Sequence, residues 1–561
     1  MGDGADWIRK RHALIFSLLI LMAYVVLYLS RSLDDNRLTS WESAFAYADV
    51  ARVFLLLIPG LVFAYVFSRV SLPERYHALF LFAVSYVTAA VFWSEPEVIV
   101  DASRYFTQAK HLELYGPGYF LREWGRGIAA WTDMPVVPFL YGLIFKCLGE
   151  GRLYIQIFTT ALFSATVLLT YLTAKTLWDE YTGLFAGLFL LGIPYLYSQV
   201  PLMLVDVASM FFLMLSVYTF IRALEKGGIT IAFSSLAMGI AFFTKYSTWL
   251  MLTVLPVIFL MYLKKDIRAV LKRGGLAMAA AGLLIAVAVY LKYDVISEQV
   301  RLLLSYQRPG LRRWGESFVS TFFFQIHPVV TVAALWSIYC AARKRDLKYL
   351  IVIWLPLLIL GLQIRRIRYI IMVFPMVSTA ASYGLMRIRD MRMRKFVALS
   401  IVISSIILAA FVYLPFMNGI SPVNLKHAGE FLDSLAAGDV EVFTLPPPEE
   451  AEANPAVSVP VLDLFTSKKI IYRYDQGIYR PPEGFETSSL RFTWGYKNPE
   501  YYADSPEGGR GSAVAVIYNE PAADIPGDIS ARVKDLPNEK TFNISDEIFG
   551  HQTFVKIYYA K

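Results

Sequence analysis

Two carboxylates and one basic–aromatic pair lie in a polar stretch of the chain, residues 94–135. Asp101 comes shortly before Arg104 and Tyr105, and Asp133 lies near the end of the stretch. A carboxylate can accept a proton from an attacking hydroxyl, and a cation can stabilise the phosphate of a leaving group. The stretch therefore has the residue types of a group-transfer site. A second role for Asp101 stays open, because Asp is also favoured at the N-cap of a helix.

More charged residues occur far along the chain, each at the end of an apolar run. Asp206 follows such a run and two prolines, and Lys245 separates two runs. Three arginines crowd into residues 365–368, and Tyr369 follows them. Whether these residues share one site with Asp101 depends on the elements that carry them.

Composition indicates what those elements are. Hydrophobic residues make up 57% of the 561 residues and charged residues 17%, against about 45–50% and about 25% in a soluble domain. The excess comes in long runs, so we expect a polytopic α-helical membrane protein. The two cysteines, Cys147 and Cys340, are far apart and exclude a disulfide framework.

The apolar runs predict about thirteen transmembrane helices, since a helix needs about 20 apolar residues to cross a bilayer. The predicted spans are 13–30, 50–68, 76–93, 153–176, 181–199, 203–222, 229–244, 247–263, 274–291, 318–340, 347–363, 369–386 and 396–415. A further run, 135–149, is only about 15 residues long and contains two prolines. We predict for it an interfacial or re-entrant helix.

Basic residues give the orientation, because lysine and arginine collect in cytoplasmic loops. With the N-terminus cytoplasmic, alternate loops are basic, provided that 135–149 does not cross. The net charge of +8 thus reflects membrane topology rather than nucleic-acid binding. The stretch 94–135, Asp206, Lys245 and the 365–368 cluster are then extracytoplasmic. Cations are disfavoured there and usually functional, although binding of lipid head groups would also explain them.

The last part of the chain has a different sequence pattern from the rest. Short β-type runs at 440–443, 470–474, 513–518 and 553–559 predict strands, and 425–437 has helical spacing. We predict a small extracytoplasmic α/β domain. The expected organisation is N-terminal helices (1–93), an outer catalytic loop (94–152), a transmembrane core (153–416) and this domain (417–561). The expected location of the protein is a plasma membrane.

The set of motifs resembles the GT-C glycosyltransferases of family 39, which includes lipid A aminoarabinose transferases and protein O-mannosyltransferases. The family opens its first outer loop with Asp-Glu-x-x-Tyr or Asp-Glu-x-Arg-Tyr. The matching elements are Asp101-Ala102-Ser103-Arg104-Tyr105, Asp133-Met134-Pro135, Asp206, Thr244-Lys245 and Arg368-Tyr369. Two departures are Ala102 in place of the second acid, and Asp133 in place of His or Glu.

The resemblance implies a fold, a reaction and residue roles. A sugar on a polyprenyl phosphate would pass, with inversion, to a hydroxyl or phosphate acceptor on a lipid, glycan or protein. Asp101 would be the catalytic base. The donor phosphate would be held by Arg104, Lys245, Arg366, Arg368 and Tyr369. Asp133, Asp206 and Tyr105 would bind substrate or metal.

Metal dependence and a rival function stay open. Three carboxylates would suit Mg²⁺ or Mn²⁺, and Asp133 with His327 would suit Zn²⁺, although His327 also suits a helix start beside Pro328. The rivals to an enzyme are a transporter or flippase of lipid-linked saccharides and a membrane anchor for the outer domain. A transporter should carry charges at mid-depth and repeated halves. Here the charges gather at one face and no repeat is visible.

Overall fold

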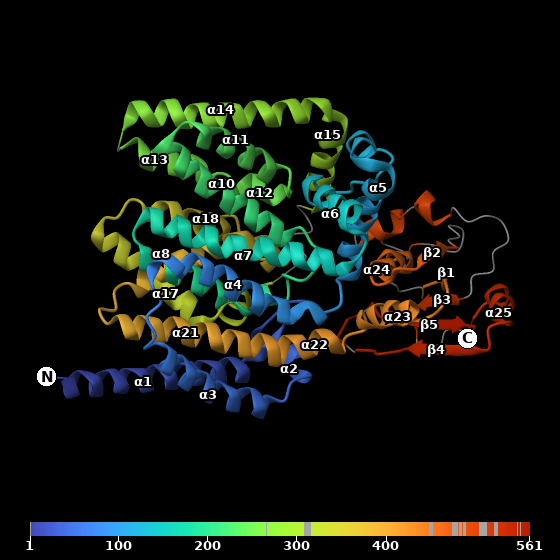
Figure 1. Ribbon diagram of the computed structural model, residues 1–561, viewed down its shortest axis with the longest axis horizontal. Helices are drawn as coiled ribbons and strands as arrows, with labels where there is room; N and C mark the ends of the chain where they lie inside the picture. The colour runs from blue at the N-terminus through green and yellow to red at the C-terminus, as the bar shows by residue number, and fades with distance from the viewer. Residues whose placement is uncertain are drawn as a thin grey trace.

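The computed structural model has a long helical bundle joined at one end to a small sheet domain (Figure 1). The N-terminus lies at the end of the bundle far from the sheet, and the C-terminus lies in the sheet domain. The structure describes residues 2–264, 266–307, 316–447, 453–473, 481, 485, 490–496, 498–503, 513–520, 525–546, 548–549 and 551–560.

Helices occupy all of the predicted spans. Eight helices of the described chain are long and apolar enough to cross a membrane, and shorter apolar helices complete the bundle, so the predicted fold class is confirmed. The bundle helices are α1 (Gly2–Leu29), α3 (Val50–Phe67), α4 (His77–Ala90), α7 (Arg152–Leu177), α8 (Glu180–Leu191), α9 (Pro194–Tyr197), α10 (Asp206–Lys226), α11 (Ile229–Phe242), α12 (Tyr246–Met251), α13 (Val254–Leu263), α14 (Ile267–Leu291), α17 (Pro328–Lys344), α18 (Tyr349–Gly361), α19 (Ile367–Ile370), α20 (Phe374–Leu385), α21 (Met391–Leu408) and α22 (Leu414–Gly419).

Prolines divide two of the predicted spans. The span 181–199 consists of α8 and α9, and Pro194 is the first residue of α9. The span 318–340 consists of a π-helical turn (Ser320–Gln325) and α17, which begins at Pro328. Proline lacks an N–H donor, so it is tolerated in the first turn and marks a new start. His327 caps α17, because its Nδ1 accepts a hydrogen bond from the Val329 N–H at 3.1 Å.

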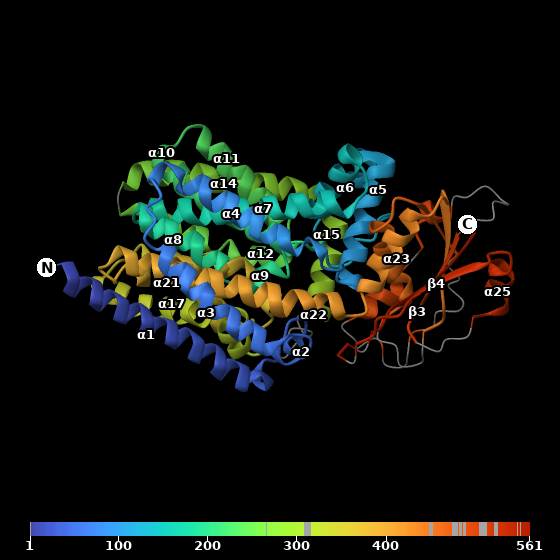
Figure 2. The ribbon, with the colours of Figure 1, turned by 60° about the horizontal axis from the view of Figure 1, so that its bottom comes forward.

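Two helices outside the predicted spans lie where the bundle meets the sheet domain (Figures 1 and 2). They are α5 (Ile99–Glu123) and α6 (Val136–Leu148), and α15 (Tyr293–Leu302) lies beside them. The apolar face of α5, with Tyr105, Phe106, Ala109 and Leu112, is buried. At 13 residues, α6 covers about 20 Å at 1.5 Å per residue, too short to cross a membrane.

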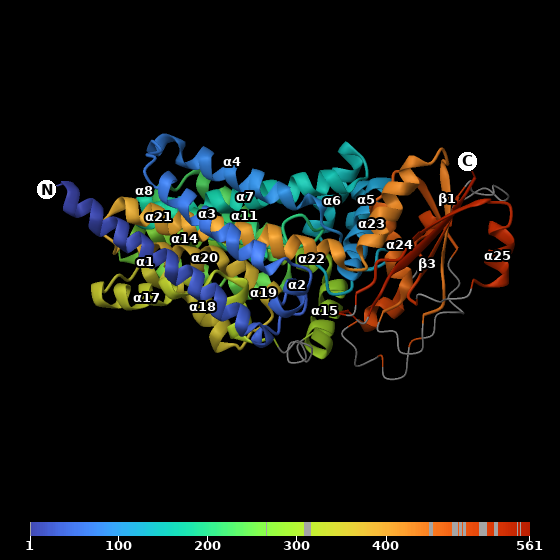
Figure 3. The ribbon, with the colours of Figure 1, turned by 90° about the horizontal axis from the view of Figure 1, so that it is seen from below.

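The sheet domain has five strands in the order β2-β1-β3-β5-β4. Their bounds are β1 (Asp439–Thr444), β2 (Lys469–Tyr472), β3 (Ala513–Tyr518), β4 (Asn538–Phe542) and β5 (Phe554–Tyr559). The strands β2, β1 and β3 are parallel, and β5 pairs antiparallel with both β3 and β4. Figure 3 shows α23 (Val423–Ser434) and α24 (Val459–Leu464) between the sheet and the bundle, and α25 (Gly527–Val533) beyond the sheet. The sequence prediction missed β4, α24 and α25.

Buried ionic contacts hold this domain against α5. Lys110 Nζ of α5 lies 2.5 Å from Asp463 Oδ2 of α24 and 3.1 Å from Glu150 Oε2. The Tyr502 hydroxyl donates to the same Asp463 oxygen at 2.8 Å. Only 2% of the Asp463 side chain is exposed, and removing one partner of a buried ion pair is strongly destabilising. The domain therefore has a defined place at the end of the bundle far from the N-terminus.

We expect Gly142→Ala to loosen the crossing of α5 and α6. A Cβ at this position would lie 2.8 Å from the Ala109 carbonyl oxygen and 2.6 Å from Leu112 Cβ. Overpacking of this kind costs about 1–3 kcal/mol. The measurement is the thermal unfolding midpoint in detergent. The control is Gly118→Ala in α5, where a new Cβ meets nothing within 4 Å; equal midpoints for the two variants would contradict the expectation.

Candidate active site

Five segments bring acids and bases together at the end of the bundle next to the sheet domain. The start of α5 carries Asp101 and Arg104, the segment before α6 carries Asp133, α10 begins at Asp206, Lys245 precedes α12, and α19 carries Arg368. The ion pairs in this charge network alternate in sign along a single path. In order, the path runs Asp133, Arg104, Asp101, Arg368, Asp206 and Lys245.

Asp101 occupies the middle of the charge network. Its Oδ1 accepts a hydrogen bond from Arg104 Nη2 at 3.0 Å, and its Oδ2 accepts one from Arg368 Nη1. The residue lies inside the first turn of α5, whose N-cap is Val98 and has no side-chain capping bond. Its interpretation as a helix N-cap is therefore wrong. Burial raises the pKa of the Asp101 carboxyl, but the two guanidinium groups outweigh it and hold the pKa well below its usual range.

Arg368 joins two carboxylates from distant parts of the chain. Its Nη2 lies 2.9 Å from Asp206 Oδ2, while its Nη1 contacts Asp101. Lys245 Nζ lies 2.5 Å from the other oxygen of Asp206. The Nε of Arg368 is buried and has no hydrogen-bond partner among the described residues. This guanidinium thus keeps one donor for a ligand.

Asp133 and Tyr105 lie at the α5 end of the charge network. Asp133 Oδ1 lies 3.1 Å from Arg104 Nη2, and its Oδ2 accepts a hydrogen bond from Gln108 Nε2 at 3.2 Å. Burial raises the pKa of the Asp133 carboxyl, and Arg104 offsets this only in part. Tyr105 is buried, with its ring centre 5.6 Å from the Arg104 guanidinium carbon.

The arginine cluster divides in two. Arg365 is exposed and donates to Gln363 Oε1 at 2.9 Å. Arg366 instead lies over the ring of Tyr369, with its guanidinium carbon 5.7 Å from the ring centre, and Lys245 Nζ lies 4.9 Å from the same centre. All nine residues that the sequence singled out thus lie in the charge network or beside it. Arg366 and Tyr369 adjoin it at the Lys245 end.

Sequence reasoning missed three residues of this region. Gln108 is seven residues after Asp101 on α5, so two helical turns place it on the same face, and this spacing could have identified it. Glu316 accepts a hydrogen bond from the Ile367 N–H at 2.8 Å and positions the start of α19. Phe492, from the sheet domain, has its ring centre 4.6 Å from the Arg104 guanidinium carbon; nothing in its local sequence predicts this contact.

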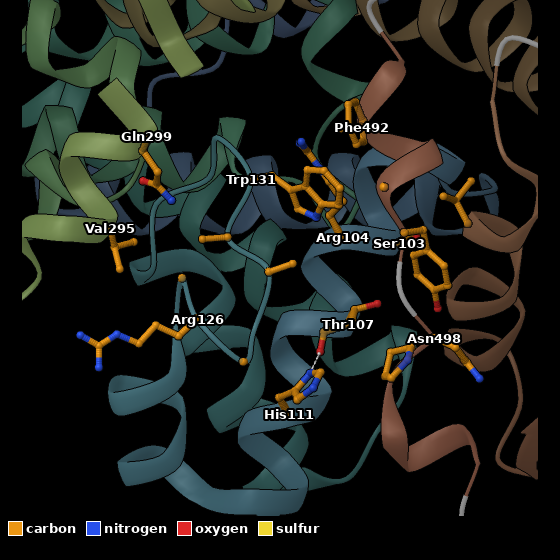
Figure 4. Close-up of a pocket in the computed structure, with 18 of the residues that line it drawn as sticks. Ser103, Arg104, Thr107, His111, Arg126, Trp131, Val295, Gln299, Phe492 and Asn498 are labelled. Carbon is orange, nitrogen blue, oxygen red and sulfur yellow. Dashed lines mark hydrogen bonds between the residues drawn. The ribbon is translucent and has the colours of Figure 1, made fainter. Parts of the chain in front are cut away.

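A cavity of about 560 Å³ lies beside Arg104. It is enclosed by α5, the segment 125–131, α15 and residues 492–500 of the sheet domain. Figure 4 shows Arg104, Trp131 and Phe492 close to one another on its wall. Ligand sites commonly have this size and are commonly lined by aromatic side chains with a few polar groups.

The carboxylates of the charge network do not fit a resident divalent ion. Every oxygen of Asp101, Asp133 and Asp206 already contacts a guanidinium, an ammonium or an amide. The residues that the structure describes contain no group of three His, Cys, Asp or Glu side chains placed to hold a metal. Both ring nitrogens of His327 are engaged, since Nε2 lies 3.0 Å from Ser404 Oγ.

Comparison with known proteins gives one family match and several structures of similar fold. Residues 132–293 match the model of the family described as dolichyl-phosphate-mannose-protein mannosyltransferase. The structure of ArnT from Cupriavidus metallidurans bound to undecaprenyl phosphate is 12% identical, with a TM-score of 0.53 over 85% of this chain and 97% of that one. The apo state of the same protein has the same identity and coverage and a TM-score of 0.54. No curated protein sequence matches the chain.

The family match lies in the segment that holds Asp133, Asp206 and Lys245, and the fold similarity extends over most of the chain. Together they confirm the resemblance that the motifs of the sequence indicated. They also favour an enzyme over a transporter or an anchor. The chain has the fold of these ArnT structures, and its residues 132–293 match the mannosyltransferase family model.

Proposed function

We propose that this enzyme transfers a sugar from a polyprenyl-phosphate donor to a hydroxyl or phosphate acceptor on the extracytoplasmic side, with inversion at the anomeric carbon. The acceptor belongs to a lipid, a glycan or a protein. The observation that carries the proposal is the position of Asp101, a partly buried carboxylate held between two arginines where five segments meet. The donor class is supported by the undecaprenyl phosphate named for the similar structure.

The distribution of charge supports the side of the membrane. The N-terminus and the charge network lie at opposite ends of the bundle (Figure 1). Near the N-terminus, Arg9 pairs with Asp390 at 2.6 Å, beside the basic run that starts α21. Lysine and arginine in such short loops favour the cytoplasm. The network and the sheet domain are then extracytoplasmic.

The chemistry needs a base and a place for the leaving phosphate. The acceptor oxygen forms a bond to the anomeric carbon as the bond from that carbon to the phosphate oxygen breaks, and the acceptor proton passes to Asp101. The electron pair of the broken bond stays on polyprenyl phosphate. Lys245, Arg366 and Arg368 would hold its charge. Tyr369 would position the first two of these cations, since both lie over its ring.

Donor binding would also free the base. With both oxygens on guanidinium groups, Asp101 is a weak proton acceptor, because its pKa is held low. A phosphate that takes the Nη1 donor of Arg368 would release Asp101 Oδ2. Asp206 would keep the same guanidinium in place through Nη2 at 2.9 Å. The base would thus become effective only when the donor is present.

Asp101→Asn should lower the transfer rate by about 10²–10⁴-fold, the usual contribution of a general base. Binding of polyprenyl phosphate should be retained or tightened, since the variant leaves Arg368 free for the phosphate. The measurements are turnover of a polyprenyl-phosphate sugar in detergent and binding of the sugar-free phosphate. The matched control is Asp294→Asn, an exposed acid at the start of α15. Near-normal transfer by Asp101→Asn would overturn the base assignment.

Arg104→Gln should move the acid side of the pH–rate profile to higher pH. Arg104 is one of the two cations that lower the pKa of Asp101; without it that pKa rises, so the carboxylate is protonated and inactive at a pH where the parent enzyme still works. The measurement is kcat/KM against pH, which reports groups of the free enzyme. Arg365→Gln, at an exposed arginine, is the control. An unchanged acid limb, or a shift to lower pH, would contradict the role of Arg104.

A further inference from the structure

The cavity beside Arg104 has its own chemistry, distinct from that of the charge network. It is lined on one side by α5 and the segment 125–131, and on the other by residues 492–500 of the sheet domain. The sheet domain thus supplies part of the wall, and the Lys110–Asp463 ion pair is one of the contacts that hold that domain against α5. Asp101, Arg368 and Lys245 do not line it.

An aromatic pair forms one part of the wall. The rings of Trp131 and Phe492 lie 5.7 Å apart between centroids, at an angle of 62°. Trp131 has a backbone φ of 51°, which is rare for a bulky residue and persists only where the surroundings enforce it. Gly495 of the sheet domain is one constraint, because a Cβ there would lie 2.8 Å from Trp131 Cη2. The Trp131 indole therefore packs directly against the sheet domain.

A buried amide forms another part of the wall. Gln299 of α15 is only 2% exposed, and its Oε1 accepts a hydrogen bond from the Tyr246 hydroxyl. Its Nε2 is buried and has no hydrogen-bond partner among the described residues. Figure 4 shows this amide directed into the cavity. Leaving such a donor unsatisfied costs about 1–3 kcal/mol, so a ligand that accepts from it would be favoured.

The wall also carries several neutral hydrogen-bonding groups. Ser103 and Thr107 of α5 and Thr493 and Asn498 of the sheet domain contribute hydroxyls and an amide. His111 also lines the cavity, and burial lowers the pKa of its imidazole, which favours the neutral form. Charged groups on the wall include both signs, so the cavity does not select an anion or a cation strongly.

The position of the cavity relative to Asp101 indicates which of the two substrates the cavity binds. Arg104 contacts both, since its guanidinium carbon lies 4.6 Å from the Phe492 ring centre and its Nη2 lies 3.0 Å from Asp101 Oδ1. The cations proposed for the donor phosphate lie beyond Asp101, at the Lys245 end of the charge network. In an inverting transfer the acceptor oxygen approaches the anomeric carbon on the side opposite the leaving phosphate. The cavity lies on the other side of Asp101 from the cations proposed for that phosphate, so it is on the acceptor side.

We infer that this cavity binds the acceptor and that the acceptor is a saccharide. A pyranose ring has a face of C–H groups that packs on an aromatic ring, and hydroxyls that bond to neutral amides and hydroxyls. Trp131 and Phe492 supply the first kind of contact, and Gln299 supplies an unused donor for the second. An acyl chain would leave these polar groups unpaired. This inference rests on the proposed function and narrows its acceptor from three classes to one.

The test compares acceptors and variants in one assay. A polyprenyl-phosphate sugar is supplied with a panel of free oligosaccharides, a Ser/Thr-containing peptide or a long-chain alcohol, and release of free sugar to water is followed separately. We expect transfer to an oligosaccharide. Trp131→Ala and Gln299→Leu should each raise the acceptor KM at least tenfold and leave the KM for the donor in the hydrolysis reaction unchanged. Trp131→Phe should restore most of the acceptor affinity, since it keeps an aromatic face.

Tyr293→Ala is the control, because Tyr293 is 65% exposed on α15 and does not line the cavity. The two proposals fail in different ways. Transfer of the sugar to the peptide or the alcohol, but to no oligosaccharide, would overturn the saccharide class, as would an unchanged acceptor KM in both Trp131→Ala and Gln299→Leu. Absence of donor turnover of any kind, hydrolysis included, would instead overturn the proposed function. Normal hydrolysis by a variant also shows that it is folded.

Discussion

The end of the bundle next to the sheet domain depends on Arg368 and the two carboxylates that it joins. Charges withdrawn from water need partners, because the desolvation penalty is several kcal/mol per ion. Asp101 comes from α5 and Asp206 from α10, and both contact one guanidinium from α19. Removing that arginine would leave the buried Asp206 and the partly buried Asp101 with one cation each. The pairing therefore holds the start of α5 against the helix bundle.

The sheet domain contacts both α5 and the charge network. Lys110, on the helix that carries Asp101, is paired with Asp463 of the domain, and Phe492 of the domain lies over Arg104. One helix thus carries Asp101 and Arg104 and contacts the sheet domain, which forms part of the cavity wall. A shift of the sheet domain would move Phe492 relative to Arg104, which donates a hydrogen bond to Asp101.

Hydrophobic periodicity and length predicted most of the fold. Apolar runs specify helices, because a backbone inside a bilayer must satisfy its own hydrogen bonds, and the short, proline-containing run 135–149 indicated the helix α6. The missed strand β4 has the sequence Asn-Glu-Lys-Thr-Phe. It is a polar edge strand that is specified by its pairing with β5 rather than by burial. Local pattern cannot reveal an element whose stability comes from a distant partner.

The sequence by itself determined which residues could do chemistry, because acids and bases at the outer ends of apolar helices are costly and their types and order survive as motifs. Only the tertiary structure decided how they pair. It showed that Asp101 is held by two arginines rather than capping a helix, and that Arg365 lies apart from Arg366 and Arg368. It also brought Gln299 and Phe492 to one cavity. Such contacts join residues hundreds of positions apart, and their energies depend on burial and distance, which no local pattern contains.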